Sequence, residues 1–338
     1  MLHAPPAIGQ HFAFAHGRTG VLLQSLMVQT DIDHLLGTHD IAELERVIAE
    51  LKMTQGIDRA QTDNASVLAA LTDWIREEVI SMTPAGKQTA FDILWMEGDI
   101  PLTAYLLKKL HGLTSEISVE PTDRLHAFPP EALRRLIEED RDDGLLPKQL
   151  THGIQSIRNA KDLTPREIDM RVAQLFADLS LALARGSRST LILRFVKKRI
   201  DLQNIRTAHR LSENKETDTL PHLLAGGTLP PALLAGNIRR TAAALRRTGF
   251  SYQLADILES PRFDANRFER VLRDIEASAI DDMWNVPLGQ EPLFAFAATA
   301  LSQISYLRVL LIGKRNRLSP QQIKAILPPF LSPTHYAS

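Results

Sequence analysis

The sequence predicts an all-α fold, and three observations support this. Apolar residues recur at helical spacing along most of the chain, strand-type alternation is nearly absent, and Leu, Ala, Ile, Arg and Glu dominate. The chain has 338 residues, of which 44% are hydrophobic and 23% are charged. It is therefore long enough for two or three units of ordinary size and apolar enough to bury a substantial core.

The first third is predicted to hold helices separated by capping residues. An apolar-rich helix covers residues 9–28, and a short turn follows at Asp31–Gly37. Asp40 and Asn64 are each placed to cap a helix with apolar residues along one face. A further long helix follows Pro84.

The middle third has stronger start signals. The Pro-Pro pair at 129–130 fixes the start of a helix, and a charged loop follows at 138–144. Residues 164–167 read Thr-Pro-Arg-Glu, which is a capping box with proline at the first helical position. The helix that it opens ends near Gly186, and a second long helix covers 191–211.

The last third begins with Gly-Gly-Thr at 226–228, which is expected to end one helix and cap a short one. Further helices are predicted at 236–248, 251–259, 264–285, 291–313 and 319–327. Polar or proline-bearing joints are predicted at 114–129, 212–221 and 284–292.

Composition excludes several classes of function. The chain has no cysteine, which rules out disulfides, thiolate catalysis and cysteine-ligated zinc. Its net charge of -1 argues against a general polyanion binder. The N-terminus lacks a secretory signal pattern, and the best apolar run, Leu293–Leu301, is about half of the ~20 residues that a spanning helix needs. Any membrane role is therefore expected to be peripheral.

Enzyme motifs are weak. No Gly-rich loop is followed by Lys-Ser/Thr, so a nucleotide P-loop is absent. Acidic clusters at 140–143 and 281–282 leave open a helical metal-dependent enzyme that acts on diphosphates, and His39-Asp40 leaves open a metal pattern. The simpler interpretation is solvated surface and a helix cap. We therefore predict no catalytic, cofactor-binding or metal-binding residues.

Basic residues form three groups. Arg239, Arg240, Arg246 and Arg247 recur at seven-residue spacing and share one helical face, and shorter runs lie at 197–199 and 314–317. Such a face can contact a partner, so a helical nucleic-acid or protein scaffold is a third alternative. Aromatic residues are not interleaved with these runs, which disfavours nucleic acid.

A polar helical pattern recurs at a spacing of 102 residues. Its clearest copy carries Asp201, Asn204, Arg206 and Arg210 among apolar residues. Asp99 lies 102 residues upstream of Asp201, with Lys108 matching Arg210, and Gln303 lies 102 residues downstream, with Arg308 matching Arg206. Equal spacing of this kind favours a chain built from repeated helical units.

At these residues the chain resembles the central-stalk connector of rotary V-type ATPases, a family with members in bacterial, archaeal and eukaryotic enzymes. The resemblance covers 164–235 most clearly, where Glu167 and Asp169 open a helix, 200–207 and Arg210 follow, and Gly-Gly-Thr-Leu stands at 226–229. It continues through 307–310 and 318–324, and more loosely through the N-terminal part.

The resemblance implies three similar helical units with a pseudo-threefold arrangement around a funnel-like central cavity, at residues 1–115, 116–218 and 219–338. It implies a non-catalytic rotor part that couples the central shaft to the membrane proteolipid ring, for proton or sodium transport. The partners would be shaft and ring subunits, without nucleic acid, small-molecule substrate or cofactor. The connector would lie peripherally on the cytoplasmic face of the membrane.

In this interpretation the polar helix residues have structural roles. The candidates are Asp169, Asp201, Asn204, Arg206, Arg210 and Arg308. We expect Asp201 to pair with a buried Arg or a helix end within its own unit. The arginines at 239–247 are the candidate partner-binding face.

Overall fold

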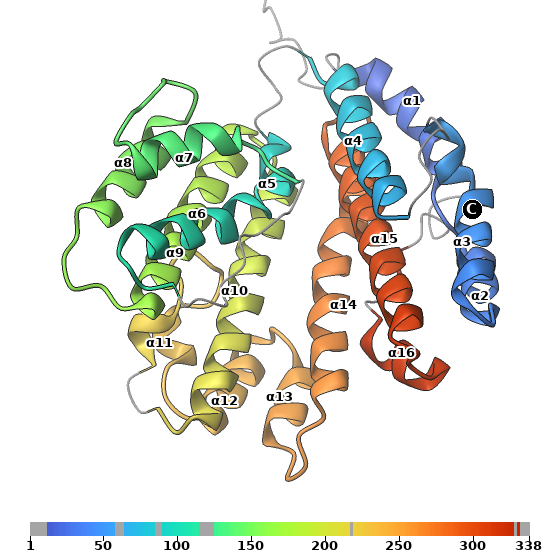
Figure 1. The fold of residues 1–338 in the computed structure, drawn as a ribbon. Coiled ribbons are helices and arrows are strands. Elements are labelled where there is room, and N and C mark those ends of the chain that lie inside the picture. The colour runs from blue at the N-terminus through green and yellow to red at the C-terminus, as the bar shows by residue number, and fades with distance from the viewer. Residues whose placement is uncertain are drawn as a thin grey trace, which may run out of the picture. The chain divides into compact units, whose positions relative to one another are not determined.

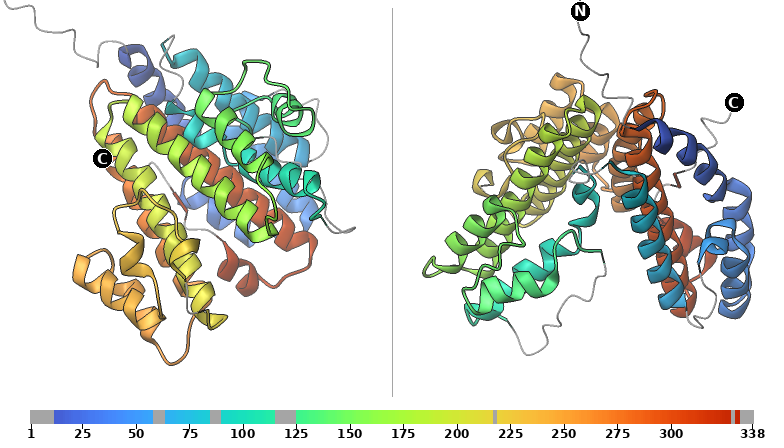
Figure 2. Two further views of the ribbon diagram at one scale, coloured as in Figure 1. Left: turned by 90° about the vertical axis from the view of Figure 1, so that its left-hand side faces the viewer. Right: turned by 90° about the horizontal axis from the view of Figure 1, so that it is seen from above.

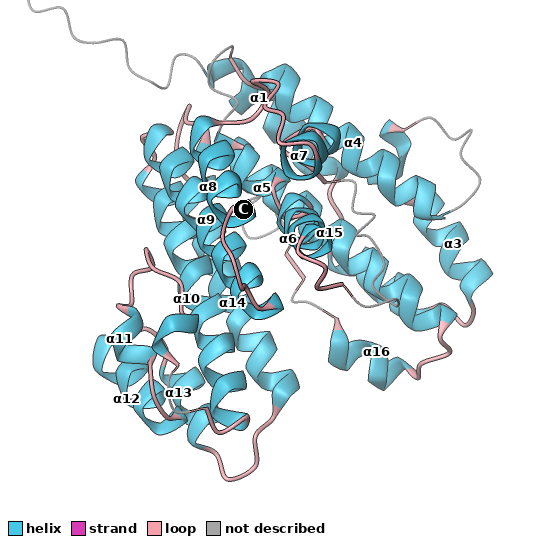
Figure 3. Ribbon diagram, turned by 60° about the vertical axis from the view of Figure 1, so that its left-hand side comes forward, coloured by secondary structure: helices cyan, strands magenta, loops and turns pink. Residues whose placement is uncertain are grey.

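The computed structural model describes residues 12–57, 64–84, 90–114, 125–216, 219–327 and 330–331, and the predicted all-α class is confirmed. Within these ranges the ordered elements are helices, and no strand is present (Figure 3). The chain divides into two compact units. We call them the terminal unit, built from residues up to 88 and from 264 onwards, and the central unit, 89–263.

The terminal unit packs around one long helix. Its N-terminal elements are α1 (Ala13–Leu22), η2 (Leu23–Ser25), α2 (Gln29–Gly37), α3 (Ile41–Glu50), η3 (Lys52–Gly56) and α4 (Asn64–Met82). Its C-terminal elements are α14 (Ala265–Trp284), α15 (Glu291–Arg315) and α16 (Pro320–Ile326). Helix α15 contacts α1, α3, α4, α14 and α16 (Figure 1). Residues 292–300, in its N-terminal half, are all buried.

Helix α15 is also apolar enough to raise the question of a membrane span. Its most apolar stretch has a mean hydropathy of 1.5, which satisfies the length and composition of a spanning helix among the described residues. However, 67% of that stretch is buried inside the structure. A core helix has this composition for the same reason, since it faces other apolar side chains on every side.

The central unit is built on the antiparallel pair α9 (Pro165–Gly186) and α10 (Thr190–Glu213), which lie side by side (Figure 2). The elements before this pair are α5 (Asp92–Trp95), α6 (Asp99–Leu110), α7 (Pro130–Glu138) and α8 (Lys148–Arg158). Those after it are η5 (Leu220–His222), α11 (Pro231–Leu234), α12 (Ile238–Thr248) and α13 (Tyr252–Glu259). Helices α5, α6 and α8 pack on α9, and α11 and α12 pack on α10.

Helix starts recur along the chain at nearly constant intervals. The short helices α2, α7 and α11 begin at Gln29, Pro130 and Pro231, each 101 residues after the previous one. The long helices α9 and α14 begin at 165 and 265, and their partners α10 and α15 begin at 190 and 291. The repeat suggested by residue types is thus also a repeat of helix positions, while the boundaries of the three predicted units stay a prediction.

Several sequence predictions of helix ends are confirmed. The Asp40 side chain accepts a hydrogen bond from the Glu43 N–H, and the capping box of α9 is complete between Thr164 and Glu167. The helices predicted from 236 to 327 all form within two residues of their expected ends. The Asn64 side chain lies outside the described residues.

Other local predictions are wrong. Asp31–Gly37 belongs to α2, because the helix buries Ile32 and Leu35. The helix expected after Pro84 is divided into α5 and α6, and α8 has no counterpart among the predicted helices. Thr228 lies in a loop and does not cap α11, which begins after Pro230 without a side-chain cap.

Candidate functional site

Asp201 is fully buried on α10 and holds the loop that precedes α11. Its two carboxylate oxygens accept hydrogen bonds from the backbone N–H groups of Thr228 and Leu229, each at 2.9 Å. We call this arrangement a polar clasp: a buried side chain that binds backbone groups just before a short helix. Of the two expected partners, a buried Arg or a helix end, the structure shows no buried Arg at Asp201 among the described residues. Asp201 binds the backbone just before α11, at 228–229, which lies outside the predicted unit 116–218.

Two glycines let that loop approach Asp201. A Cβ at Gly227 would lie 2.1 Å from the Asp201 Oδ1, and one at Gly226 would lie 2.4 Å from Leu181 Cδ1. Gly226 also has a φ of 99°, which L side chains rarely adopt. Gly227 thus allows close approach to Asp201 on α10, and Gly226 allows the positive φ beside Leu181 on α9.

Asn204 adds a second bond pattern one helical turn further along α10. Its Nδ2 donates to the Leu224 carbonyl at 2.8 Å, and its Oδ1 accepts from the Leu224 N–H at 2.7 Å. Asn204 is 0% exposed. An amide matches this site because it supplies one donor and one acceptor to the same backbone residue.

Asp99 forms the equivalent clasp at the start of α6. It is also 0% exposed, and it accepts from the N–H of Ala127 at 2.8 Å and of Phe128 at 3.4 Å. The His126 Nδ1 lies 2.8 Å from Asp99 Oδ1. This clasp therefore holds the loop before α7 as Asp201 holds the loop before α11.

Gln303 on α15 forms the third clasp, with a different set of partners. Its Oε1 accepts from the Met27 N–H at 2.9 Å, and its Nε2 donates to the carbonyls of Met27 at 3.0 Å and Leu331 at 2.8 Å. Here the backbone offers one donor and two acceptors, so a carboxylate would not fit. The amide in this copy, where the other two have aspartate, follows from that pattern.

The three clasps have one geometry in common. Their partners Met27, Phe128 and Leu229 are each buried, and each stands two residues before a short helix. The sequence separations of Asp99 from Phe128 and of Asp201 from Leu229 are 29 and 28 residues, whereas Gln303 reaches back 276 residues to Met27. With the predicted bounds of the three units, each clasp would join one unit to the next, and the last unit to the first.

Burial affects the charge of the two aspartates. It raises the pKa of Asp99 and of Asp201, while the hydrogen bonds that each carboxylate accepts oppose the shift. Both side chains are 0% exposed. Asp201 binds the backbone of Thr228 and Leu229 and the Thr228 side chain, while Asp99 binds backbone N–H groups and His126, so each carboxylate fastens a loop to a helix.

The other polar candidates of the repeat are dispersed. Asp169 on α9 forms an ion pair with Lys108 on α6 at 2.6 Å. Arg206 is half-buried, and Arg210 and Arg308 are exposed. The structure therefore brings Asp99, Asp201 and Gln303 into equivalent roles, but it does not do so for the basic residues that match along the sequence.

The candidate partner-binding arginines are not equivalent. Arg246 forms ion pairs with Asp256 at 2.6 Å and with Glu259, both on α13, so it joins α12 to α13. Arg239, Arg240 and Arg247 are exposed. We therefore leave Arg246 out of the candidate surface.

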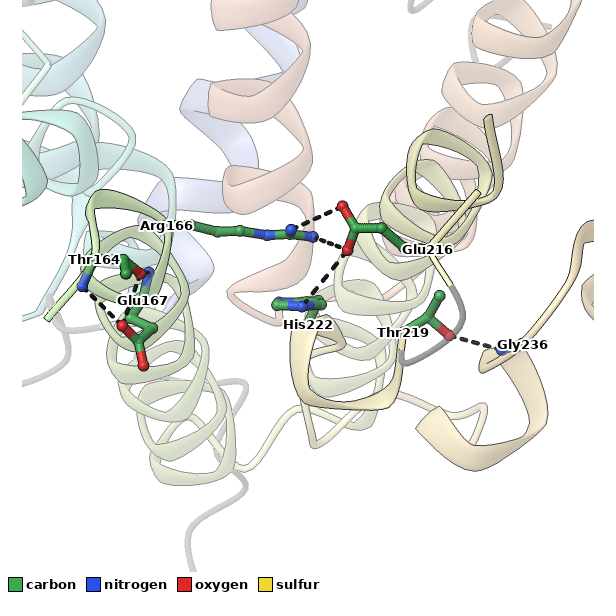
Figure 4. A network of polar contacts seen from close by, with 7 residues as sticks. All are labelled: Thr164, Arg166, Glu167, Glu216, Thr219, His222 and Gly236. Carbon is green, nitrogen blue, oxygen red and sulfur yellow. Dashed lines mark hydrogen bonds and ion pairs between the residues drawn. The ribbon is translucent and has the colours of Figure 1, made fainter. Parts of the chain in front are cut away.

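A polar network connects the start of α9 with the segment after α10 (Figure 4). The Arg166 guanidinium donates two hydrogen bonds to Glu216, at 2.8 and 2.9 Å, and His222 Nε2 lies 3.9 Å from the same carboxylate. The bonds from Arg166 lower the pKa of Glu216. The sequence does not predict this network, because Arg166 and Glu216 lie 50 residues apart and share no motif.

Glu216 gives the network a predictable pH dependence. A carboxylate with a lowered pKa in the folded state adds stability above its unfolded pKa of about 4.3, and this stability is lost as the pH falls through the folded value. We expect Glu216→Gln to be less stable than the wild type at pH 7 and the difference to vanish near pH 3. Thermal unfolding from pH 3 to 7 measures this, with Glu77→Gln, an exposed residue without a partner in the described structure, as control. A difference that is constant with pH would contradict the assignment.

The acidic clusters that kept a metal-dependent enzyme open are engaged or exposed. In the loop after α7, Asp143 pairs with Arg135 and Arg141, and Asp140 pairs with Arg158. Asp281 and Asp282 lie exposed near the end of α14. Among the described residues, no group of three or more His, Asp or Glu side chains is placed to hold a metal ion.

The terminal unit has a shallow cavity of about 330 Å³ between α2, α14, α15 and α16. Its lining includes Ile32, Leu36, Arg270, Asp274 and Tyr306. Burial raises the pKa of Tyr306 to about 12. Tyr306 occupies the repeat position of Asn204, so this copy replaces a backbone-binding amide with an aromatic side chain.

The helical fold and its backbone-binding clasps define a structural protein, in which buried polar groups hold helices and loops together. The chain belongs to the ATP synthase (C/AC39) subunit family, whose model matches residues 16–326. Members of this family are non-catalytic subunits of the membrane-associated V-type ATPase complex. No curated protein sequence matches the chain.

Proposed function

We propose that this chain is the rotor connector of a V-type ATPase, which joins the central shaft to the membrane proteolipid ring and passes torque between them. In this role it would lie peripherally on the cytoplasmic face of the membrane and serve proton or sodium transport. The observation that carries the proposal is the series of three polar clasps at 99, 201 and 303.

The clasps suit a part that must transmit torque. Torque is passed efficiently only by a body that does not deform, and interhelical joints are where a helical body would yield. Each clasp fixes such a joint with two or three hydrogen bonds to a buried side chain. Buried hydrogen bonds to a charged group contribute roughly 1.5–3 kcal/mol each, and removing one partner leaves the other unsatisfied.

The cyclic order of the clasps supports three units arranged around a common axis. In a closed ring each unit contacts the next, and the last contacts the first. The pairs 99 with 128, 201 with 229, and 303 with 27 follow this order. We therefore keep the three units 1–115, 116–218 and 219–338, with a pseudo-threefold axis and a funnel-like cavity, as part of the proposal.

The proposal predicts specific partners. The purified full-length chain is expected to be retained both by the shaft subunits and by the detergent-solubilised proteolipid ring of the same ATPase, and to bridge them when both are present. A pull-down with each partner alone and with both together measures this. Retention by neither partner would exclude the connector role. Magnesium-dependent hydrolysis of isoprenoid diphosphates, or salt-sensitive binding to nucleic acid, would favour the respective alternative function.

A further inference from the structure

We propose that the outward face of α12, formed by Arg239, Arg240 and Arg247, is a docking surface for an acidic polypeptide segment of another ATPase component. We call this set the α12 arginine face. The inference rests on the proposed function, because it places the acidic segment within the ATPase complex. It adds to that function the proposal that one contact with a partner consists of ion pairs between these arginines and the partner's carboxylates.

The first argument is charge. Within the described residues, no carboxylate forms an ion pair with Arg239, Arg240 or Arg247, and all three are exposed. The nearby acids Asp256 and Glu259 are both engaged by Arg246. Arg246 is therefore the arginine of α12 that forms ion pairs within the described unit, and the other three keep an unpaired positive charge. This local excess of positive charge lies on a chain whose net charge is -1.

The second argument is that one of these arginines is held in place. The Arg240 Nη2 donates to the Ala232 carbonyl at 3.3 Å. Its aliphatic part passes over Gly236, where a Cβ would lie 3.4 Å from Arg240 Cδ. The Gly236 N–H donates to the buried hydroxyl of Thr219 at 2.7 Å, so the loop beneath Arg240 is itself fixed (Figure 4). A guanidinium has five N–H donors, so this one bond leaves others for a carboxylate.

The third argument is that Arg239 and Arg240 lie at the end of α12 where the helix dipole disfavours a cation, whereas Arg247, in the last turn, is favourably placed. Arg239 and Arg240 lie in the first turn, which has no acidic residue. The helix N-terminus carries partial positive charge, so arginine there costs stability, and acidic residues would be favoured. Residues that oppose a local structural preference are expected where function requires them.

Spacing and composition define the partner. Arg240 and Arg247 are two helical turns apart, about 10 Å along the axis. An acidic helix with carboxylates at the same interval, lying along α12, would pair with both. Tyr252 at the start of α13 is 64% exposed, and exposed Arg and Tyr are among the residue types most enriched at the centres of protein interfaces.

Other polyanions fit the α12 arginine face less well. A membrane surface would need apolar side chains to insert, whereas the remaining exposed residues of α12 include only Ala243 and Thr248. Single-stranded nucleic acid would need several aromatic side chains for base stacking, whereas α12 contains none and α13 adds the single aromatic residue Tyr252. An acidic protein surface needs only the guanidinium groups, which bind carboxylates with two parallel hydrogen bonds.

The test uses the full-length chain with the double substitution Arg240→Glu/Arg247→Glu. We expect its affinity for the assembled shaft and ring subunits to fall at least about tenfold, because each reversal places like charges together. Wild-type binding is expected to weaken with added salt. The unfolding temperature should stay close to that of the wild type, since one reversal is favourable and the other unfavourable for the helix dipole. The matched control is Arg171→Glu/Arg185→Glu, two exposed arginines of α9 in the same unit, which should bind normally.

The outcomes separate the two proposals. If the wild type binds no part of the ATPase, the connector function fails. If the wild type binds and the double variant binds equally well, the docking surface is excluded while the connector function stands. A third arm adds vesicles containing about 30% phosphatidylserine, an anionic lipid that attracts basic surfaces. Arginine-dependent binding to these vesicles, with unchanged binding to shaft and ring, would assign the face to lipid and overturn the inference.

Discussion

Replacing Asp201 with alanine is expected to destabilise the chain by about 2–5 kcal/mol, because the buried Leu229 N–H and the part-buried Thr228 N–H lose their acceptor and a cavity is left. Asp201→Asn is expected to cost less, about 1–2 kcal/mol. The amide oxygen of asparagine can accept from only one of the Thr228 and Leu229 N–H groups, while its NH₂ group faces the other. The same change removes the cost of burying a charge, which raises the pKa of Asp201 in the wild type. Urea unfolding of the full-length variants measures both values.

The control for Asp201 is Asp73→Ala, an exposed position on α4 without a partner in the described structure, which should change stability by less than about 0.5 kcal/mol. If Asp201→Ala is as stable as the wild type, the clasp is not a structural joint. If Asp201→Asn is fully stable, one acceptor is sufficient, and the preference for aspartate at this position needs another explanation.

Replacing Gln303 with glutamate is expected to be more destabilising at pH 7 than replacing it with alanine. The glutamate carboxylate would face the carbonyls of Met27 and Leu331, with no donor for the oxygen that replaces Nε2. An unpaired buried charge costs several kcal/mol or takes up a proton, so we expect a loss of about 3–5 kcal/mol. Since repulsion raises the pKa of such a group, the folded variant binds a proton more tightly than the unfolded one. Its stability should therefore recover as the pH falls towards 5.

Thermal unfolding of Gln303→Glu and Gln303→Ala between pH 5 and 8 tests this reversal. Gln203→Glu, an exposed residue on α10 outside the clasp, is the matched control and should show little pH-dependent loss. Equal stability of Gln303→Glu and the wild type at pH 7 would mean that the Nε2 bonds are absent in solution. Together with Asp201→Asn, the experiment asks whether each clasp residue is selected by the backbone groups that it binds.

The sequence predicts best those helices whose ends carry local signals. Thr164 and Asp40 act through backbone groups only three residues away, so the pattern contains the whole interaction. Helix α8 gives a weak sequence signal because Gly153 interrupts it. A Cβ there would lie 2.2 Å from Leu175 Cδ1 on α9, so a larger residue would force that side chain to move. The sequence of α2 resembles a turn because its local helix propensity is weak. The segment is nevertheless helical, since burial in tertiary contacts overrides weak local propensity.

The clasps can be predicted from the sequence only in part. The spacing of 102 residues relates Asp99, Asp201 and Gln303 to one another, and the resemblance indicates the family. Their partners are backbone N–H and C=O groups, which nearly every residue has, so no side-chain pattern points to Met27, Phe128 or Leu229. For the same reason the sequence does not explain why the third position is glutamine.

The bond between Gln303 and Met27 constrains the order in which parts of this protein can fold during synthesis. A ribosome makes the chain from its N-terminus, so Met27 emerges long before Gln303 exists, and the terminal unit cannot close until almost the whole chain is available. The central unit, whose clasps span 28 and 29 residues, has its partners at hand much earlier. Closing a loop of 276 residues rather than 28 costs about 2 kcal/mol more in chain entropy. We therefore expect the N-terminal helices to remain only partly packed until α15 has been synthesised. Premature termination after the central unit would leave them without this core helix.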